Sequence, residues 1–167
     1  MQRSTERILT THAGRLPNPD NIAVIQQARA TADQATFDRL VRAGVADRVR
    51  KQIELGIDII DDGEYSKPSF VTYVNERLGG FEIDKEAPPR SPWAGTREAL
   101  SFPEFYAQGH VGSRQPRRVC TGPVVYKGQA QLQRDIANLK AVLIGVKVSD
   151  VFMPSISPSN IEEWNRN

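Results

Sequence analysis

Short apolar runs alternate with helical patterns along this chain, and this order restricts its possible folds more than any other feature. The runs cover residues 7–12, 57–61, 118–121 and 149–153, and polar or glycine- and proline-containing loops follow them. Strands that alternate with helices form parallel sheets through right-handed crossovers. The sequence therefore predicts an α/β fold.

The helical patterns differ in clarity. The clearest lies within residues 37–53, where Phe37, Leu40, Val41, Val45, Val49 and Ile53 fall on one stripe of 3.6-residue period. A second helix is predicted over 129–144, with Leu132, Ile136, Leu139 and Leu143 on one face. Shorter helices are predicted at 21–30, 70–78, around 102–108 and from 157 onward. Prolines break the segment 82–116, which is predicted to be irregular.

Both an open doubly wound sheet and a barrel fit this order of elements. No GxGxxG follows the first run, which disfavours a dinucleotide-binding sheet. His12, Glu64 and Ser157 come just after predicted strands, as catalytic residues do in barrels. A full barrel needs roughly 250 residues. We therefore predict a partial (β/α)8 TIM-type barrel of about four βα units, spanning residues 1–167 with an irregular insertion at about 82–116.

Charge and composition disfavour several classes of partner. The net charge of +2 does not indicate nucleic acid or an anionic membrane as a partner. No run of about 18 apolar residues is present, and the first residues are too charged for a signal peptide. A cytoplasmic location is therefore expected. Cys120, His12 and His110 cannot form an internal disulfide or a Cys/His zinc site by themselves.

Residues 10–17 join a strand end to a glycine turn. Gly14 allows a ligand to approach the backbone, where N–H groups can hold a carboxylate. His12 could donate a hydrogen bond to that anion, and Arg15 could pair with it through two bonds. The alternative is a histidine satisfied at a strand end and a surface arginine.

Residues 61–64 place Asp61, Asp62 and Glu64 at the end of an apolar run. Crowded carboxylates raise one another's proton affinity, which suits acid–base chemistry or the binding of an amine. Lys67 could neutralise part of this charge. The alternative is an acidic loop near a helix N-terminus, where negative charge is favourable.

Several segments, taken in order, resemble the catalytic barrel of the cobalamin-independent methionine synthase family. The resemblance spans nearly the whole chain and includes a shorter, single-barrel subgroup of the family. The segments that carry it are 8–17, 52–58, 62–64, 74–81, 121–124, 135–140 and 152–158.

The resemblance implies a zinc-dependent methyltransferase of methionine biosynthesis. In this family a zinc-bound homocysteine thiolate attacks the methyl group of methyl-folate. Carried over residue by residue, the resemblance implies Ala13, Gly14 and Arg15 for the carboxylate side and Glu64 for the ammonium group. His12, Ser66 and Lys67 complete the predicted set of substrate-binding residues.

Two departures from the family pattern bear on function. Arg15 stands where the family often has serine, and the His/Cys/Glu/Cys zinc ligands would lie on strands beyond Asn167. We therefore expect the N-terminal half of a barrel that is inactive alone, with no metal ligands or catalytic residues in this chain. Coenzyme M is an alternative thiol. A non-catalytic half-barrel is the alternative in another class: it would bind a small acid or a partner chain, and its open edges favour self-association or pairing with the missing C-terminal half.

Overall fold

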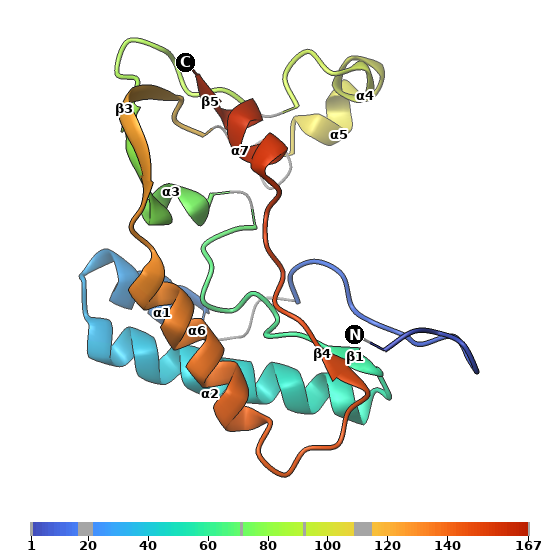
Figure 1. Cartoon of the computed structure of the whole chain (residues 1–167). Helices are drawn as coiled ribbons and strands as arrows, with labels where there is room; N and C mark the ends of the chain where they lie inside the picture. Colours follow the sequence, from blue (N-terminus) through green and yellow to red (C-terminus); the bar gives the residue numbers. More distant parts are fainter. Residues whose placement is uncertain (1, 17–21, 71, 92, 109–114, 167) are drawn as a thin grey trace. The chain divides into compact units, whose positions relative to one another are not determined.

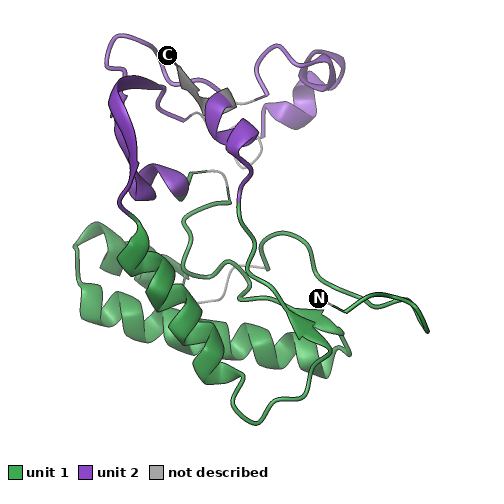
Figure 2. Cartoon of the chain, viewed as in Figure 1, with its two compact units in different colours: residues 1–73, 128–155 green, residues 74–127, 156–167 purple. Residues whose placement is uncertain are grey.

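The computed structural model describes residues 2–16, 22–70, 72–91, 93–108 and 115–166. The chain divides into two compact units, shown in Figure 2. Unit 1 contains residues 1–73 and 128–155, and unit 2 contains residues 74–127 and 156–167. In sequence, unit 2 therefore interrupts unit 1.

Unit 1 contains a small parallel sheet and the longest helices. Its elements are α1 (Ile22–Ala30), α2 (Gln34–Glu54), β1 (Ile59–Ile60), α6 (Gln129–Val142) and β4 (Asp150–Val151). Strands β1 and β4 are parallel neighbours, with Ile59 opposite Asp150, and Thr11 forms a further parallel bridge to Ile59 (Figure 1). Three segments far apart in sequence thus run in the same direction.

The core of unit 1 forms where α2 and α6 cross (Figure 1). Val41, Val45 and Val49 of α2 are buried with Ile60 of β1 and Leu139 of α6. Each such burial contributes about 1.5–3 kcal/mol. The predicted apolar stripe of α2 is therefore confirmed.

Local chemistry fixes the ends of α2. The Asp33 side chain accepts a hydrogen bond from the Thr36 N–H at 3.1 Å and caps the N-terminus. The helix ends at Glu54, and Gly56 follows in the left-handed conformation (φ 74°) that favours glycine just after a helix.

Unit 2 is built around an antiparallel strand pair. Its elements are α3 (Val74–Arg77), β2 (Leu78–Ile83), α4 (Arg97–Ser101), α5 (Pro103–Tyr106), β3 (Arg118–Tyr126), α7 (Pro158–Trp164) and β5 (Asn165–Arg166). Strand β3 pairs antiparallel with β2 and parallel with β5. Among the described residues of unit 2, only Val74, Arg77 and Ile156 are buried. This unit therefore has little core of its own.

The helix predicted over 70–78 is mostly wrong. Of the residues of this range that the structure describes, 70 and 72–78, only Val74–Arg77 are helical, and Leu78 already begins β2. Gly79 and Gly80, which follow the predicted helix, lie inside this strand. A side chain at Gly80 would meet the Pro123 carbonyl oxygen at 2.5 Å, so close packing against β3 accounts for this glycine.

The prediction for the third strand is also partly wrong. The run at 118–121 was expected to stop at Gly122-Pro123 and to run parallel to its neighbours. Instead β3 continues to Tyr126 and is antiparallel to β2. The register shifts between Gly79 and Phe81, which pair with Val125 and Cys120, so Pro123 falls in the irregular part of the ladder. A proline needs no ladder N–H at such a position.

The other expected elements are present but shorter. The runs at 57–61 and 149–153 form two-residue strands, and the run at 7–12 joins the sheet only through the bridge at Thr11. Residues 21–30 and 129–144 give α1 and α6, although Asn21 lies outside the described residues. The helix expected around 102–108 reduces to α5, and the one expected from 157 is α7.

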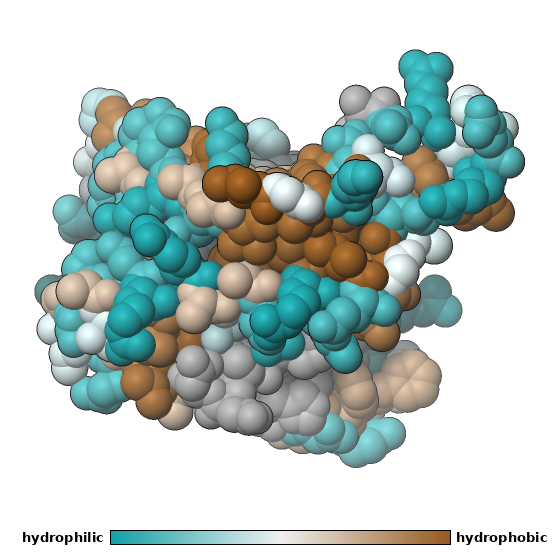
Figure 3. Space-filling model, turned by 90° about the horizontal axis from the view of Figure 1, so that it is seen from below, coloured by the Kyte–Doolittle hydropathy of each residue, from teal (hydrophilic) through white to brown (hydrophobic). Residues whose placement is uncertain are grey.

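Apolar side chains also reach the surface. On the face drawn in Figure 3 they form a continuous area among polar residues. The large apolar residues of unit 1 that are more than half exposed are Ile8, Val24, Leu55 and Ile144. Within the described ranges, no helix is long and apolar enough to cross a membrane.

Candidate functional site

The candidate site lies at the carboxyl ends of β1 and β4. The loop 61–67 follows β1, and residues 152–155 follow β4. Because the two strands are parallel, both segments leave the sheet at the same edge. Ligands of α/β proteins bind at this edge.

Two short turns shape the loop after β1. The carboxylate Oδ1 of Asp61 accepts a hydrogen bond from the Gly63 N–H at 2.7 Å, and Oδ1 of Asp62 accepts one from the Glu64 N–H at 3.0 Å. Aspartate favours turns because its side chain can bond the backbone two residues ahead. These bonds lead the chain into left-handed conformation at Gly63 (φ 67°) and at Glu64 (φ 56°).

Glu64 is the most unusual residue of this loop. Its side chain is 0% exposed, and within the described residues neither carboxylate oxygen has a hydrogen-bond partner. A buried carboxylate without partners is costly, and so is left-handed backbone at a residue other than glycine. Such strain concentrates at functional sites. The arrangement is suited to a ligand that donates hydrogen bonds to Glu64.

Neighbouring charges set the protonation of the three acids. Burial raises the pKa of Glu64; Lys67 and Arg15 oppose that rise, while Asp62 and Asp61 add to it. Burial also raises the pKa values of Asp62 and Asp61, against the opposing effects of Lys67 and of the bond from Gly63. A cationic ligand group would shift these pKa values back down.

Lys67 connects the two loops. Its side chain is 3% exposed, and Nζ donates a hydrogen bond to the Pro154 carbonyl oxygen at 2.5 Å. Nζ also lies 5.0 Å from the centre of the Tyr73 ring, a cation–π distance. The Tyr73 hydroxyl is 3.3 Å from Oγ of Ser155. Lys67 thus ties the loop after β1 to the segment after β4.

Residues 12–16 leave the sheet at the same edge, because Thr11 before them pairs in parallel with Ile59 of β1. Arg15 is half-buried and donates a hydrogen bond to the Pro68 carbonyl oxygen at 2.8 Å. His12 is half-buried as well, and its Nε2 has no hydrogen-bond partner within the described residues. Ala13 and Gly14 are exposed. This loop could hold an anionic group close to the acidic loop.

The seven predicted site residues are not placed alike. Arg15 and Lys67 both act electrostatically on Glu64, and His12 acts on Asp61. Ser66 makes a different kind of contact. Its carbonyl oxygen accepts a hydrogen bond from Arg29, and its hydroxyl is buried without a partner in the described chain.

Sequence reasoning missed Gln52 as a residue that supports the site. Gln52 had a visible signal, because it is a polar residue on the apolar stripe that includes Val45 and Val49.

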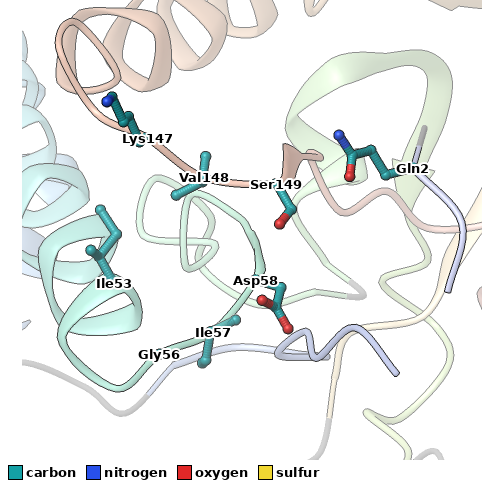
Figure 4. Close-up of a pocket in the computed structure, with 8 residues that line it drawn as sticks. All are labelled: Gln2, Ile53, Gly56, Ile57, Asp58, Lys147, Val148 and Ser149. Carbon is teal, nitrogen blue, oxygen red and sulfur yellow. The ribbon is translucent and has the colours of Figure 1, made fainter. Parts of the chain in front are cut away.

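A separate pocket of about 390 Å³ opens at the opposite ends of the same strands (Figure 4). Its lining comes from residues 56–58 and 147–149, which precede β1 and β4, together with Gln2 and Ile53. Its carboxylate, Asp58, is already occupied by Arg7 and by the N–H and hydroxyl of Thr10. These contacts hold the pKa of Asp58 well below its usual range. The carboxyl ends of the strands, where Glu64 has no hydrogen-bond partner in the described chain, are therefore the better candidate for a ligand site.

The described residues do not fit a zinc ion. Within residues 2–16, 22–70, 72–91, 93–108 and 115–166, no group of three or more His, Cys, Asp or Glu side chains could hold a metal. Cys120 lies on β3 of unit 2, where its Sγ donates to the Gly122 carbonyl oxygen at 3.3 Å. Cys120 is half-buried, and His110 lies outside the described residues.

The fold and the site together define the chain as an α/β protein whose polar loops gather at one edge of a parallel sheet. The B12-independent methionine synthase from Shewanella sp. W3-18-1, solved in complex with selenomethionine, has a similar fold. The TM-score is 0.58 at 17% sequence identity, and the match covers 94% of this chain and 40% of that one.

The chain belongs to the family of cobalamin-independent synthase catalytic domains, whose family model matches residues 8–91. The 5-methyltetrahydropteroyltriglutamate–homocysteine methyltransferase of Bifidobacterium animalis subsp. lactis is 30% identical over 145 residues, covering 77% of this chain and 19% of that protein. The enzyme of the same name from Vibrio harveyi is 23% identical over 184 residues, covering 92% and 23%. The chain thus spans about a fifth of the length of these curated relatives.

Proposed function

We propose that this chain forms the amino-acid-binding part of a methyltransferase that acts on homocysteine or a similar thiol. The supporting observation is Glu64, a buried carboxylate whose two oxygens have no hydrogen-bond partner in the described chain. The names of the relatives add homocysteine as the acceptor and methyltetrahydropteroyltriglutamate as the donor.

In this proposal each end of the amino acid has its own loop. The ammonium group donates hydrogen bonds to Glu64, and Asp61 and Asp62 add negative potential around it. The carboxylate lies at the loop of His12, Ala13, Gly14 and Arg15, where Arg15 supplies a fixed positive charge. Charge-assisted hydrogen bonds of this kind are short and strong.

The remaining parts of the proposal reach beyond this chain. The parallel strands and their helices are consistent with the start of a (β/α)8 barrel. The apolar surface of Figure 3 supports either self-association or cover by a further part of the barrel. The zinc ion implied by the family would need ligands other than the described residues, and amino-acid binding at Glu64 does not depend on it. Coenzyme M would be a poorer ligand for Glu64, because it has no ammonium group.

Binding measurements on the variant Glu64→Gln test the proposal. Titration calorimetry would compare L-homocysteine with 4-mercaptobutanoate, which lacks the ammonium group. Glu64→Gln should weaken homocysteine binding by about 1–3 kcal/mol, because a charged hydrogen bond is lost, and leave 4-mercaptobutanoate binding unchanged.

The matched control is Glu54→Gln, on the exposed side of α2, where Glu54 is 55% exposed. This variant should bind both ligands as the unsubstituted protein does. Equal homocysteine affinity in the unsubstituted protein and Glu64→Gln would remove Glu64 from the site.

A further inference from the structure

Gln52 is a buried amide beside the candidate site. It lies in the last turn of α2, and its side chain is 1% exposed. It belongs to the face of the helix that carries Val45 and Val49. A polar side chain on a buried apolar face lowers stability unless its hydrogen bonds are made.

The amide of Gln52 makes two hydrogen bonds to the backbone of Asp61. Nε2 donates to the Asp61 carbonyl oxygen at 2.9 Å, and Oε1 accepts from the Asp61 N–H at 3.1 Å. Strand β1 ends at Ile60, whose carbonyl oxygen is the last to accept from the neighbouring strand, from the Phe152 N–H at 3.1 Å. The side chain of Gln52 therefore takes the place of a strand neighbour at Asp61.

The acidic loop begins at this fixed residue. The Asp61 carboxylate accepts from the Gly63 N–H, and the Asp62 carboxylate accepts from the Glu64 N–H. Gly63 and Glu64, which donate these two bonds, both have left-handed backbone. Such backbone persists only where the surroundings hold it firmly. The two bonds from Gln52 to the backbone of Asp61 come first in this series of hydrogen bonds.

We infer that Gln52 is a positioning residue: through Asp61, it holds the turn that presents Glu64 to the ammonium group of the ligand. The inference rests on the proposed function, since it gives Gln52 a role in binding that amine. Gln52 itself does not touch the ligand. Its contribution is to keep Glu64 buried in one orientation before the ligand arrives.

The test replaces the amide by an apolar side chain of similar length. Gln52→Met should weaken L-homocysteine binding about tenfold, because removing one member of a coupled network changes the others. Binding of 4-mercaptobutanoate, which cannot use Glu64, should stay unchanged. The matched control is Gln34→Met at the start of the same helix, where the Gln34 amide bonds only Asp38 across one turn at the surface. The control should bind both ligands normally.

A double-mutant cycle separates positioning from general stability. In the Glu64→Gln background, Gln52→Met should change homocysteine affinity by less than about twofold, because the group it positions is absent. A purely structural role would weaken both ligands in both backgrounds. If thermal melts show that Gln52→Met does not fold, Gln52→Glu takes its place, since it keeps the acceptor for the Asp61 N–H and loses the donor to the carbonyl.

The outcomes distinguish the two claims. If Glu64→Gln leaves homocysteine affinity unchanged, the proposed function fails, and this inference fails with it. If Glu64→Gln weakens binding but the Gln52 variants do not, or affect both ligands alike, only the positioning role is overturned. Weakening that is confined to the amine-bearing ligand and absent in the Glu64→Gln background would support it.

Discussion

At the scale of single residues, the acidic loop combines burial with crowded negative charge. Asp62 is 2% exposed, and its Oδ1 already accepts the Glu64 N–H. Burial raises its pKa, and the nearby Asp135 adds to this effect while Lys67 opposes it. The loop therefore holds protons more tightly when folded than when unfolded.

The pH dependence of stability follows from this shift. Between the ordinary aspartate pKa of about 4 and the raised value, the folded protein binds more protons than the unfolded chain, so the free energy of unfolding falls as pH rises. Urea melts at a series of pH values would measure this decline. Asp62→Asn should show a shallower decline above the ordinary aspartate pKa of about 4, because the amide oxygen keeps the bond to Glu64 but does not titrate.

The lowered pKa of Asp58 acts in the other direction and at lower pH. Its contribution is lost as pH falls below the ordinary aspartate value, and it is common to both proteins in the comparison. An identical slope in the unsubstituted protein and Asp62→Asn would show that Asp62 does not titrate differently on folding.

At the scale of elements, the packing of α2 against the loop after β1 depends on one small residue. A Cβ at Gly44 would lie 2.1 Å from Cε1 of Tyr65. Tyr65 is buried in the core of unit 1 beside Val45. Gly44 therefore makes room for the tyrosine ring next to the acidic loop.

Gly44→Ala should destabilise the protein although alanine is the better helix former. The helix gains about 1 kcal/mol from the change, and overpacking costs about 1–3 kcal/mol. The net loss should be up to about 2 kcal/mol in denaturant melts. In the Tyr65→Leu background the same change should stabilise the helix. A stabilising effect in the unsubstituted protein would contradict the packing around Gly44.

The same elements show what the sequence could and could not predict. The apolar stripe of α2 is predictable from the sequence because a 3.6-residue period needs only local information. The Asp-Asp-Gly-Glu turn is predictable because aspartate and glycine favour turns. The pairing of β2 with β3 is not predictable from the sequence, because Gly80 and Pro123 are residues that usually interrupt strands. The structure accommodates them at an irregularity in the strand pairing. The role of Gln52 was overlooked because its hydrogen-bond partners are the backbone N–H and carbonyl groups of Asp61, and the sequence does not show which backbone groups a side chain will meet.

At the scale of the whole molecule, the two units differ in how they bury side chains. Unit 1 holds the core cluster around Val45 and Leu139. In unit 2, Leu100, Phe102, Phe105, Val124 and Val125 are all about half exposed or more. Unit 2 should therefore be the less stable of the two.

Two spectroscopic probes can follow the units separately. Both tryptophans, Trp93 and Trp164, belong to unit 2, whereas the long helices α2 and α6 belong to unit 1. Tryptophan fluorescence should therefore change at a lower urea concentration than the far-ultraviolet circular dichroism signal. Val45→Ala, a core truncation in unit 1, should lower only the dichroism midpoint. Coincident midpoints that move together would mean that the chain unfolds as one cooperative unit.

The bond between Lys67 and the Pro154 carbonyl oxygen joins residues 87 positions apart. A ribosome releases the acidic loop well before it makes the proline that receives its lysine. Until that later stretch emerges, the nascent loop carries an ammonium group with no carbonyl to hold it beside three carboxylates. The edge that carries the candidate site is therefore completed only after Pro154 has been synthesised.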